Sequence, residues 1–139
     1  MAQSARLKPI TVLIVENEAV VRIELAERLA RAGLIVLDAG DADEAIALLD
    51  LHPDIQILLT DIKMPGSMDG LRLAHHVRHR WPPVKIIVMS GLAETQLSDL
   101  PLDSIFLAKP YAPDDLTAAL ARVMGGAEPP ALDKMGLHI

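Results

Sequence analysis

Five short apolar runs divide the chain into segments of similar length. Each run is continuous rather than alternating, rich in Val, Ile and Leu, and bounded by polar residues, Pro or Gly. Strands of a parallel sheet carry runs of this kind, because helices cover both of their faces. The predicted strands are ITVLIV (10–15), LIVLDA (34–39), IQILL (55–59), KIIVM (85–89) and SIFLA (104–108).

Apolar residues recur at helical spacing between these runs. In the first helical stretch, opposite charges lie four residues apart, and we expect Glu18 to pair with Arg22. Asp41 and Glu44 resemble a capping box at the start of the second. Helices are predicted over 18–32, 41–51, 70–81 and 113–124. A further short helix, the fourth in chain order, is predicted over 93–100.

Strands alternating with helices predict an α/β fold, a three-layer doubly wound five-stranded parallel sheet with right-handed crossovers. We expect one domain over residues 9–124 and no output domain beside it. Residues 1–8 are expected to form an N-terminal extension, and residues 125–139 a flexible C-terminal tail.

Composition narrows the class of protein. The 139 residues are 51% hydrophobic, enough for a packed core, and carry a formal charge of −6. An acidic chain argues against a protein that binds nucleic acid through its whole surface. There is no cysteine for a thiolate metal site, and no apolar run approaches the ~18 residues of a membrane span. We therefore expect a soluble cytoplasmic protein that binds neither nucleic acid nor membranes.

Polar residues whose side chains can take part in a reaction follow four of the strands. Glu16 and Asn17 follow the first strand, Asp61 follows the third, Ser90 the fourth and Lys109 the fifth. Ligands of open α/β sheets bind beyond the carboxyl ends of the strands, where these residues converge. A carboxylate can be a nucleophile, and oxygen ligands can hold Mg²⁺. A lysine and a hydroxyl can bind phosphoryl oxygens, so the set favours phosphoryl chemistry.

Each of these residues also has a structural interpretation. Asp61 can cap a turn, and the run Glu16–Glu18 can cap the following helix. Lys109-Pro110 can be a strand end with a turn, and Ser90-Gly91 an ordinary turn. The histidine-rich stretch 75–79 is interpreted as a solvated helix face, because no third metal ligand is evident.

The segments around these residues resemble the receiver domain of two-component response regulators. The resemblance extends from about Thr11 to Met124 and implies the flavodoxin-like strand order 2-1-3-4-5. The spacings from Asn17 to Asp61 and from Asp61 to Lys109 are also similar to those of the family. The matching segments are IVENE (14–18), LLTDIKMPGSMDG (58–70), VMSG (88–91) and FLAKPY (106–111).

The resemblance implies a role for each residue. Asp61 matches the phosphoacceptor, which receives a phosphoryl group from a histidine kinase or histidine phosphotransfer protein. Ser90 and Lys109 match residues that contact this phosphoryl group. The implied Mg²⁺ ligands are Glu16, Asn17, Asp61 and the backbone carbonyl of Lys63.

A conformational switch is implied as well. Phe106 matches an aromatic residue that swings inward as the hydroxyl at Ser90 turns, and Pro110 matches a proline preceded by a cis peptide bond. Phosphorylation then shifts the population toward a state that binds an unknown downstream protein. We expect a monomer or a weak dimer.

Three departures from the family pattern matter. Asn17 stands where the family has a second acid, so we expect weaker Mg²⁺ binding. The loop MPGSMDG (64–70) is one residue longer than usual, and the side chain of Lys63 adds a cation near the phosphoryl site. The short segment 91–103 predicts a stunted fourth helix, which is part of the family's usual output face.

Two functions follow from these features. The leading hypothesis is a stand-alone phosphorylatable receiver, which catalyses its own phosphorylation and dephosphorylation but turns over no external metabolite. The alternative is a pseudo-receiver, a protein-binding module that works without phosphorylation. Asn17 motivates this alternative, whereas Asp61, Ser90 and Lys109 argue against it. An aspartyl-nucleophile phosphatase is rejected, because it needs a second Asp at the position of Lys63.

Overall fold

Five parallel strands form the sheet in the computed structural model, which describes residues 9–91 and 97–124. The order β2-β1-β3-β4-β5 confirms the predicted topology. The register places Val15 beside Thr60, and Asp61 beside Met89, so neighbouring strands end at the same edge. The strands are β1 (Thr11–Val15), β2 (Ile35–Ala39), β3 (Ile57–Asp61), β4 (Lys85–Ser90) and β5 (Ile105–Ala108).

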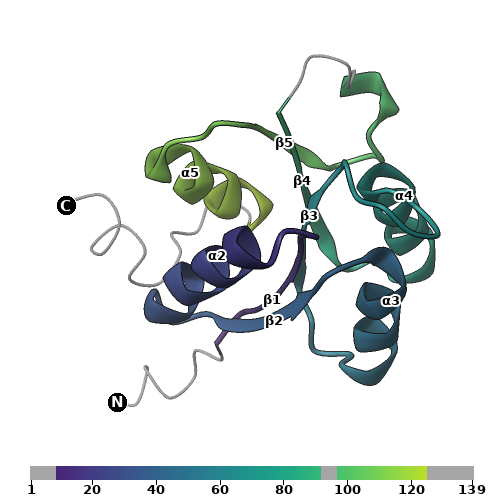
Figure 1. The fold of residues 1–139 in the computed structure, drawn as a ribbon, viewed down its shortest axis with the longest axis horizontal. Helices are drawn as coiled ribbons and strands as arrows, with labels where there is room; N and C mark the ends of the chain where they lie inside the picture. Colours follow the sequence, from purple (N-terminus) through teal and green to yellow (C-terminus); the bar gives the residue numbers. More distant parts are fainter. Residues whose placement is uncertain (1–8, 92–96, 125–139) are drawn as a thin grey trace.

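Helices cover both faces of this sheet. In the described residues they are α2 (Ala19–Arg31), α3 (Ala42–Leu51), α4 (Gly70–Arg80) and α5 (Pro113–Val123). Figure 1 shows α2 and α5 on one face and α3 and α4 on the other. Side chains alternate between the layers, so that Ile14 faces the α2–α5 core and Leu13 the α3–α4 core. All of β1 and β3 is therefore buried, as the continuous apolar runs predicted.

Local sequence signals determine where the helices begin and end. The Asp41 carboxylate accepts a hydrogen bond from the backbone N–H of Glu44 at 2.9 Å and caps α3. The Glu44 carboxylate accepts from the N–H of Gly40 at 2.8 Å rather than from Asp41, so the predicted capping box is displaced by one residue. Gly33, in the left-handed region with φ 100°, follows the end of α2.

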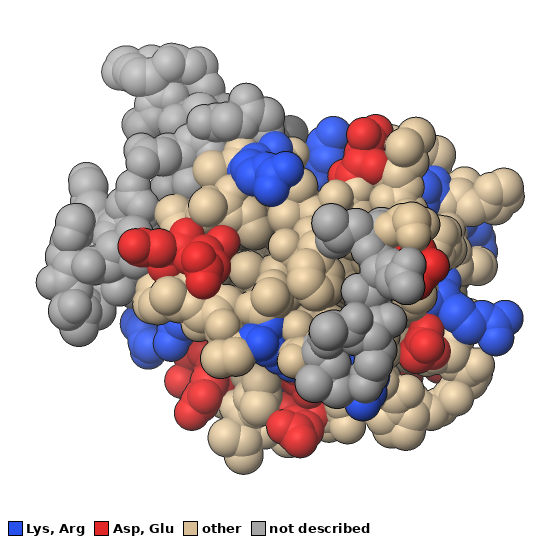
Figure 2. Space-filling model, turned by 90° about the horizontal axis from the view of Figure 1, so that it is seen from above, with Lys and Arg blue, Asp and Glu red and all other residues tan. Residues whose placement is uncertain are grey.

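The described surface carries charges of both signs. Figure 2 shows a face on which acidic and basic side chains are interspersed with uncharged ones, rather than gathered by sign. No helix in residues 9–91 and 97–124 has the length and apolar character to cross a bilayer.

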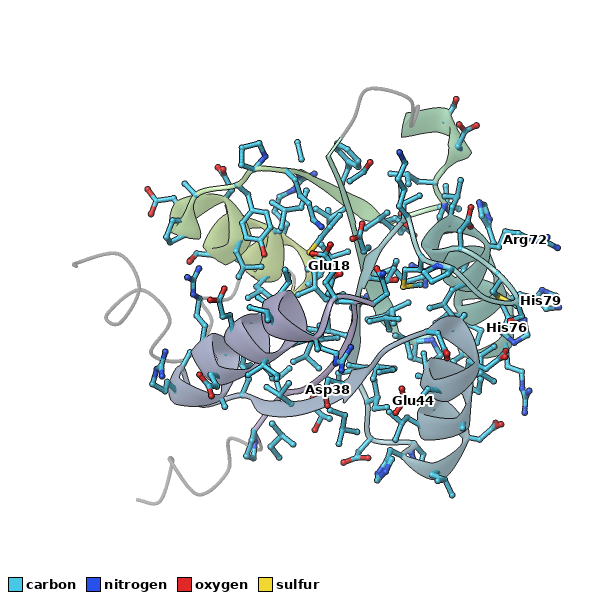
Figure 3. All side chains as sticks on the ribbon, in the orientation of Figure 1. Glu18, Asp38, Glu44, Arg72, His76 and His79 are labelled. Carbon is cyan, nitrogen blue, oxygen red and sulfur yellow. The ribbon has the colours of Figure 1, made fainter. Side chains whose placement is uncertain are left out.

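Two histidines of α4, His75 and His76, contact other residues of the protein. His75 Nε2 donates to the carbonyl of Asp99 at 2.7 Å, and the His76 ring meets the Trp81 ring edge-on with centroids 5.9 Å apart. Figure 3 shows His76 and His79 on the outer side of α4. Among the described residues, no three His, Cys, Asp or Glu side chains gather as a metal cluster would require.

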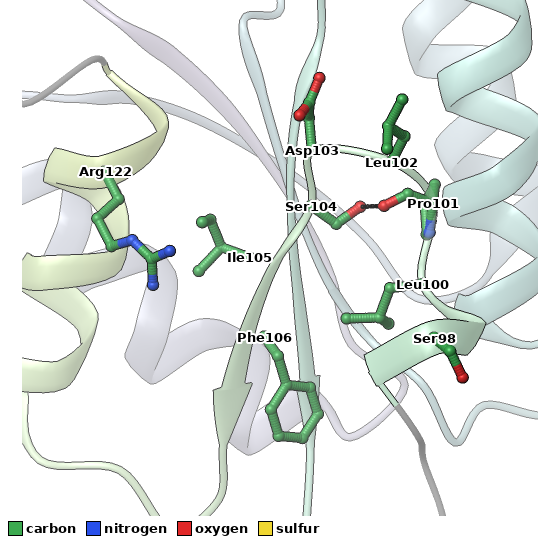
Figure 4. A pocket seen from close by; sticks show the side chains of 9 residues that line it. All are labelled: Ser98, Leu100, Pro101, Leu102, Asp103, Ser104, Ile105, Phe106 and Arg122. Atoms are coloured by element: carbon green, nitrogen blue, oxygen red, sulfur yellow. Dashed lines mark hydrogen bonds between the residues drawn. The ribbon is translucent and has the colours of Figure 1, made fainter.

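The crossover from β4 to β5 differs from the other crossovers. The first part of the predicted helix over 93–100 lies outside the described residues, and Leu97–Asp99 form a single 3₁₀ turn, η1. Arg78 on α4 holds the following loop by donating from Nε to the carbonyl of Leu102 at 3.0 Å. Figure 4 shows the hollow of about 600 Å³ that this loop forms beside β5, with Phe106 and Arg122 in its lining.

Candidate functional site

The carboxyl edge of the sheet brings the predicted site residues to neighbouring positions. Glu16 directly follows β1, Asp61 is the last residue of β3, Ser90 ends β4 and Lys109 directly follows β5. The N–H of Lys109 donates to the carbonyl of Ser90 at 2.8 Å, which extends the pairing of β4 and β5 into the site. The backbone of the sheet therefore fixes where these side chains begin.

Lys109 joins the two carboxylates. Its Nζ lies 2.9 Å from Asp61 Oδ2 and 3.6 Å from Glu16 Oε1. The exposed fraction of the side chain is 2% at Glu16 and 12% at Asp61, but 29% at Lys109. Two buried carboxylates and one ammonium leave a net negative charge in a poorly solvated place, which attracts a further cation.

The pKa values of two of these groups reflect both their burial and the charges around them. Burial raises the pKa of the Glu16 carboxyl above its ordinary value, and the charge of Asp61 acts in the same direction. Burial lowers the pKa of Lys109, but its interactions with the carboxylates of Asp61 and Glu16 together outweigh this effect, so the pKa is raised overall. Lys109 is therefore a firmly charged ammonium at neutral pH.

The residues present fit a divalent cation. Glu16 Oε2 accepts from the N–H of Glu18 at 3.0 Å, but the buried Glu16 Oε1 has no hydrogen-bond partner. A buried carboxylate oxygen of this kind needs a cation or water to offset the cost of its burial. Carboxylate, amide and carbonyl oxygens are the ligands that Mg²⁺ prefers, together with water.

The remaining predicted residues lie around this centre. Asn17 and Lys63 have exposed side chains, and Ser90 is buried at the end of β4. Phe106 is half-buried on β5 and lines the hollow of Figure 4. The peptide bond between Lys109 and Pro110 is cis.

The longer loop after Asp61 is tied to a neighbouring helix. Ser67 Oγ donates to Asp43 Oδ1 on α3 at 2.7 Å, and Gly66 adopts a left-handed conformation with φ 111°. Asp69 then caps α4 by accepting from the N–H of Arg72 at 2.9 Å. The longer loop is thus anchored to α3 through Asp43.

Gly70 is a residue whose importance the sequence analysis missed. Its N–H donates to the carbonyl of Ile62 at 2.8 Å, so the first turn of α4 rests on the backbone after Asp61. A Cβ at Gly70 would overlap the backbone oxygen of Asp61 and lie 2.6 Å from its carbonyl carbon. The motif containing Gly70 was visible in the sequence, but this backbone contact joins two elements and has no sequence pattern.

The predicted ion pair between Glu18 and Arg22 is wrong. The Arg22 guanidinium instead donates from Nη1 to the backbone carbonyl of Glu16 at 2.7 Å and from Nε to Asp38 Oδ2 at 3.2 Å. Helical spacing placed Glu18 four residues before Arg22, but the carboxylate that Arg22 binds is that of Asp38 on β2.

Comparisons with known sequences agree with this geometry. A model of the response regulator receiver domain matches residues 12–121. The transcriptional regulatory protein PdtaR of Mycobacterium tuberculosis is 37% identical over 117 residues, covering 81% of this chain and 55% of PdtaR. The response regulator receiver protein CpdR of Brucella abortus is 33% identical over 116 residues, covering 81% of this chain and 95% of CpdR. The chain thus spans about half the length of PdtaR and almost all of CpdR.

Solved structures show the same fold. A response regulator receiver protein from Sinorhizobium medicae matches with a TM-score of 0.77 and 27% identity, over 85% of this chain and 96% of that one. A chain of the CheX–CheY–BeF3–Mg²⁺ complex from Borrelia burgdorferi matches with a TM-score of 0.78 and 26% identity, over 88% of this chain and 94% of that one.

Proposed function

Because this chain belongs to the receiver domain family of two-component response regulators, we propose that it accepts a phosphoryl group on Asp61. Phosphoryl acceptance is the general function of this family of signalling domains, which interact with histidine kinases or phosphotransfer proteins. The observation that carries the assignment to Asp61 is the Lys109 ammonium, 2.9 Å from Oδ2 and beside the buried Glu16 carboxylate. A carboxylate at a strand end, with a cation held against it, suits the role of phosphoryl acceptor.

In the proposed reaction, a carboxylate oxygen of Asp61 attacks the phosphorus of a phosphohistidine. The new O–P bond forms as the P–N bond breaks, and its electron pair remains on the imidazole, which takes up a proton. Lys109 already holds Oδ2 and is placed to bind an oxygen of the transferred group. Water later hydrolyses the acyl phosphate and restores Asp61, so no external metabolite is turned over.

Receiver domains generally bind Mg²⁺ at the phosphorylation site, and the buried Glu16 Oε1, which has no hydrogen-bond partner, supports such a site here. We propose that the ligands are Glu16, Asn17, Asp61 and the backbone carbonyl of Lys63. The bound ion would supply positive charge against the phosphoryl oxygens. Because Asn17 contributes no charge, binding should be weaker than in a site with two acids at these positions.

A metal titration tests this point. Asn17→Asp adds a carboxylate, so it should tighten Mg²⁺ binding about tenfold in calorimetry of the unphosphorylated protein. Asp50→Asn, which removes a charge from an exposed ion pair with Arg80 instead, serves for comparison. Sub-millimolar Mg²⁺ binding by the wild type would contradict the proposed effect of Asn17.

We propose that Ser90 and Phe106 form the switch. The Ser90 hydroxyl, at the end of β4, would turn toward the phosphoryl group, and Phe106 would move inward from the hollow that it lines. The hollow would change shape as a result, which links phosphorylation to the binding of a downstream protein.

The proposed unit is a stand-alone receiver over residues 9–124. The 95% coverage of CpdR supports this scope, although PdtaR is covered over only 55%. We propose a monomer or weak dimer that acts in the cytoplasm and binds proteins rather than nucleic acid or membranes. The formal charge of −6 argues against binding of nucleic acid through the whole surface, and the face in Figure 2 carries interspersed charges rather than a basic patch.

Asn17 also favours a second candidate, a pseudo-receiver that binds its partner without phosphorylation. One experiment separates the two functions. The protein is incubated with Mg²⁺ and a small acyl phosphate and weighed intact, with Asp61→Asn in parallel. A single phosphoryl adduct that is absent from the variant and lost in hydroxylamine supports phosphorylation of Asp61. No adduct at any Mg²⁺ concentration, and none from histidine kinases, would support the pseudo-receiver.

A further inference from the structure

Arg22 links the backbone of Glu16 to the neighbouring strand β2. From the second turn of α2, its Nη1 donates to the carbonyl of Glu16 at 2.7 Å, and its Nε to Asp38 Oδ2 at 3.2 Å. The Arg22 side chain is 22% exposed, so these contacts are partly shielded from water. A charged donor to a carbonyl in such a place makes a strong hydrogen bond.

The contact to Glu16 completes the restraints on this residue. The Glu16 N–H donates to the carbonyl of Ala39 at 3.1 Å, which continues the pairing of β1 with β2. Its side chain accepts from the N–H of Glu18 through Oε2. The carbonyl of Glu16 belongs to the peptide group that leads into Asn17, so Arg22 fixes the orientation of the peptide joining these two residues.

The sequence leaves space for this guanidinium. A Cβ at Gly40 would lie 3.3 Å from Arg22 Nη1, closer than most side-chain contacts, and 3.6 Å from Glu44 Oε1. The N–H of Gly40 is itself held by that Glu44 oxygen at 2.8 Å. The guanidinium of Arg22 on α2 thus binds Asp38 on β2 and lies beside Gly40, which is held by Glu44 on α3; Figure 3 shows Asp38 and Glu44.

We propose that Arg22 is a positioning residue for the metal-binding corner of the site. It holds the Glu16–Asn17 peptide so that the Glu16 carboxylate and the Asn17 amide point at a common cation, and it touches neither the cation nor the phosphoryl group. This inference rests on the proposed function for the identity of the ligands. Partners that orient metal ligands in this way contribute about 10–100-fold to metal affinity.

The test measures Mn²⁺ binding to the unphosphorylated protein from the loss of the free-ion signal in electron paramagnetic resonance. Arg22→Met should weaken binding about tenfold, and Arg22→Lys should recover part of this loss, because an ammonium can still donate to the Glu16 carbonyl. Arg80→Met is the matched control. It removes an arginine from an exposed pair with Asp50 on the other face of the sheet and should leave affinity unchanged.

Gly40→Ala provides a second variant, in which Arg22 remains but its space is reduced. We expect a smaller loss of Mn²⁺ affinity, in the same direction. Urea denaturation of each variant checks that it is folded under the conditions of the binding experiment. A change in Mn²⁺ affinity is then not a loss of folded protein. Wild-type affinity in both Arg22→Met and Gly40→Ala would overturn the inference, even if both are less stable, and so would absence of Mn²⁺ binding in the wild type. If the variants change Mn²⁺ affinity as expected but the wild type gives no phosphoryl adduct, the phosphorylation of Asp61 is overturned and the role of Arg22 stands.

Discussion

Lys109 balances two carboxylates that would otherwise repel each other. Glu16 and Asp61 are both buried, and the ammonium lies within 3.6 Å of each. Burial raises the pKa of Glu16, which shows that its charged form is held at a cost. The excess negative charge of this group suits a site that takes up a cation.

Replacing Lys109 with Met should therefore destabilise the metal-free protein. Breaking a fully buried ion pair costs about 3–5 kcal/mol, but Lys109 is 29% exposed, so we expect a loss of about 1–3 kcal/mol. Urea denaturation in a chelator and again with Mg²⁺ measures this loss, and Mg²⁺ should restore part of it. Lys85→Met, at an exposed position that begins β4, should change stability by less than about 0.5 kcal/mol. Equal losses in the two variants would contradict the balancing role.

Gly70 tests the geometry of Asp61 without altering a charge. In Gly70→Ala the added Cβ overlaps the backbone of Asp61, so either α4 or the end of β3 must move. We expect a loss of about 3 kcal/mol in urea denaturation, at the upper end for overpacking, and a strongly reduced phosphoryl adduct in intact mass measurements. Gly91→Ala is the control, because its Cβ would make only an ordinary contact, 3.8 Å from the Lys109 Cβ. Full phosphorylation of Gly70→Ala would show that the site tolerates displacement of Asp61.

The helices that flank the site differ in how they begin. α3 and α4 are capped by the carboxylates of Asp41 and Asp69, whereas the first residue before α2, Glu18, makes no side-chain cap. The start of α2 instead follows directly from the proposed metal ligands Glu16 and Asn17. The Glu16 carboxylate, which accepts from the N–H of Glu18, therefore belongs both to the site and to the entry into α2.

Asp41→Ala removes the cap of α3 and should lower the free energy of unfolding by about 1 kcal/mol. Asp41→Asn should keep most of this stability, because the amide oxygen still accepts from the N–H of Glu44. Urea denaturation curves of the two variants give the comparison. An equal loss in both would indicate that charge at the helix end, rather than the hydrogen bond, is responsible.

The regular elements were predictable because each depends on a local pattern. Continuous apolar runs identified all five strands, since both faces of the sheet are covered, and the capping residue Asp41 placed the start of α3. The crossover before β5 gave a weak pattern, and its described part is a single 3₁₀ turn held by contacts from α4. Contacts with a neighbouring helix have no local signature.

The site residues, too, were predictable only where a local pattern placed them. Strand ends predicted that Glu16, Asp61 and Lys109 converge, because the carboxyl ends of parallel strands share an edge. The contacts of Gly70 with Asp61 and of Arg22 with Asp38 join elements that are distant in sequence. Helical spacing favoured Glu18 as the partner of Arg22, and only the packing of α2 on β2 reveals the alternative.

At the scale of the whole molecule, the segment after β5 connects the site to the core. Lys109 contacts Asp61, and two residues later Tyr111 packs against the layer formed by α2 and α5. Burial raises the pKa of Tyr111 above its ordinary value of 10.0. The pKa of Lys109 is also raised, so both groups bind their protons more tightly in the folded state than in the unfolded chain.

The sign of the resulting pH dependence follows from linkage. The stability contributed by Tyr111 is fully present below pH 10 and is lost as the pH rises through the higher pKa of the folded state, because the unfolded chain releases the proton first. The free energy of unfolding should therefore fall above pH 10, with each group adding at most about 1.4 kcal/mol per pH unit. Tyr111→Phe should flatten this alkaline limb, and the slope that remains should include the part due to Lys109. Urea denaturation from pH 8 to 11 measures both curves, and equal slopes in the wild type and Tyr111→Phe would show that Tyr111 titrates alike in the two states.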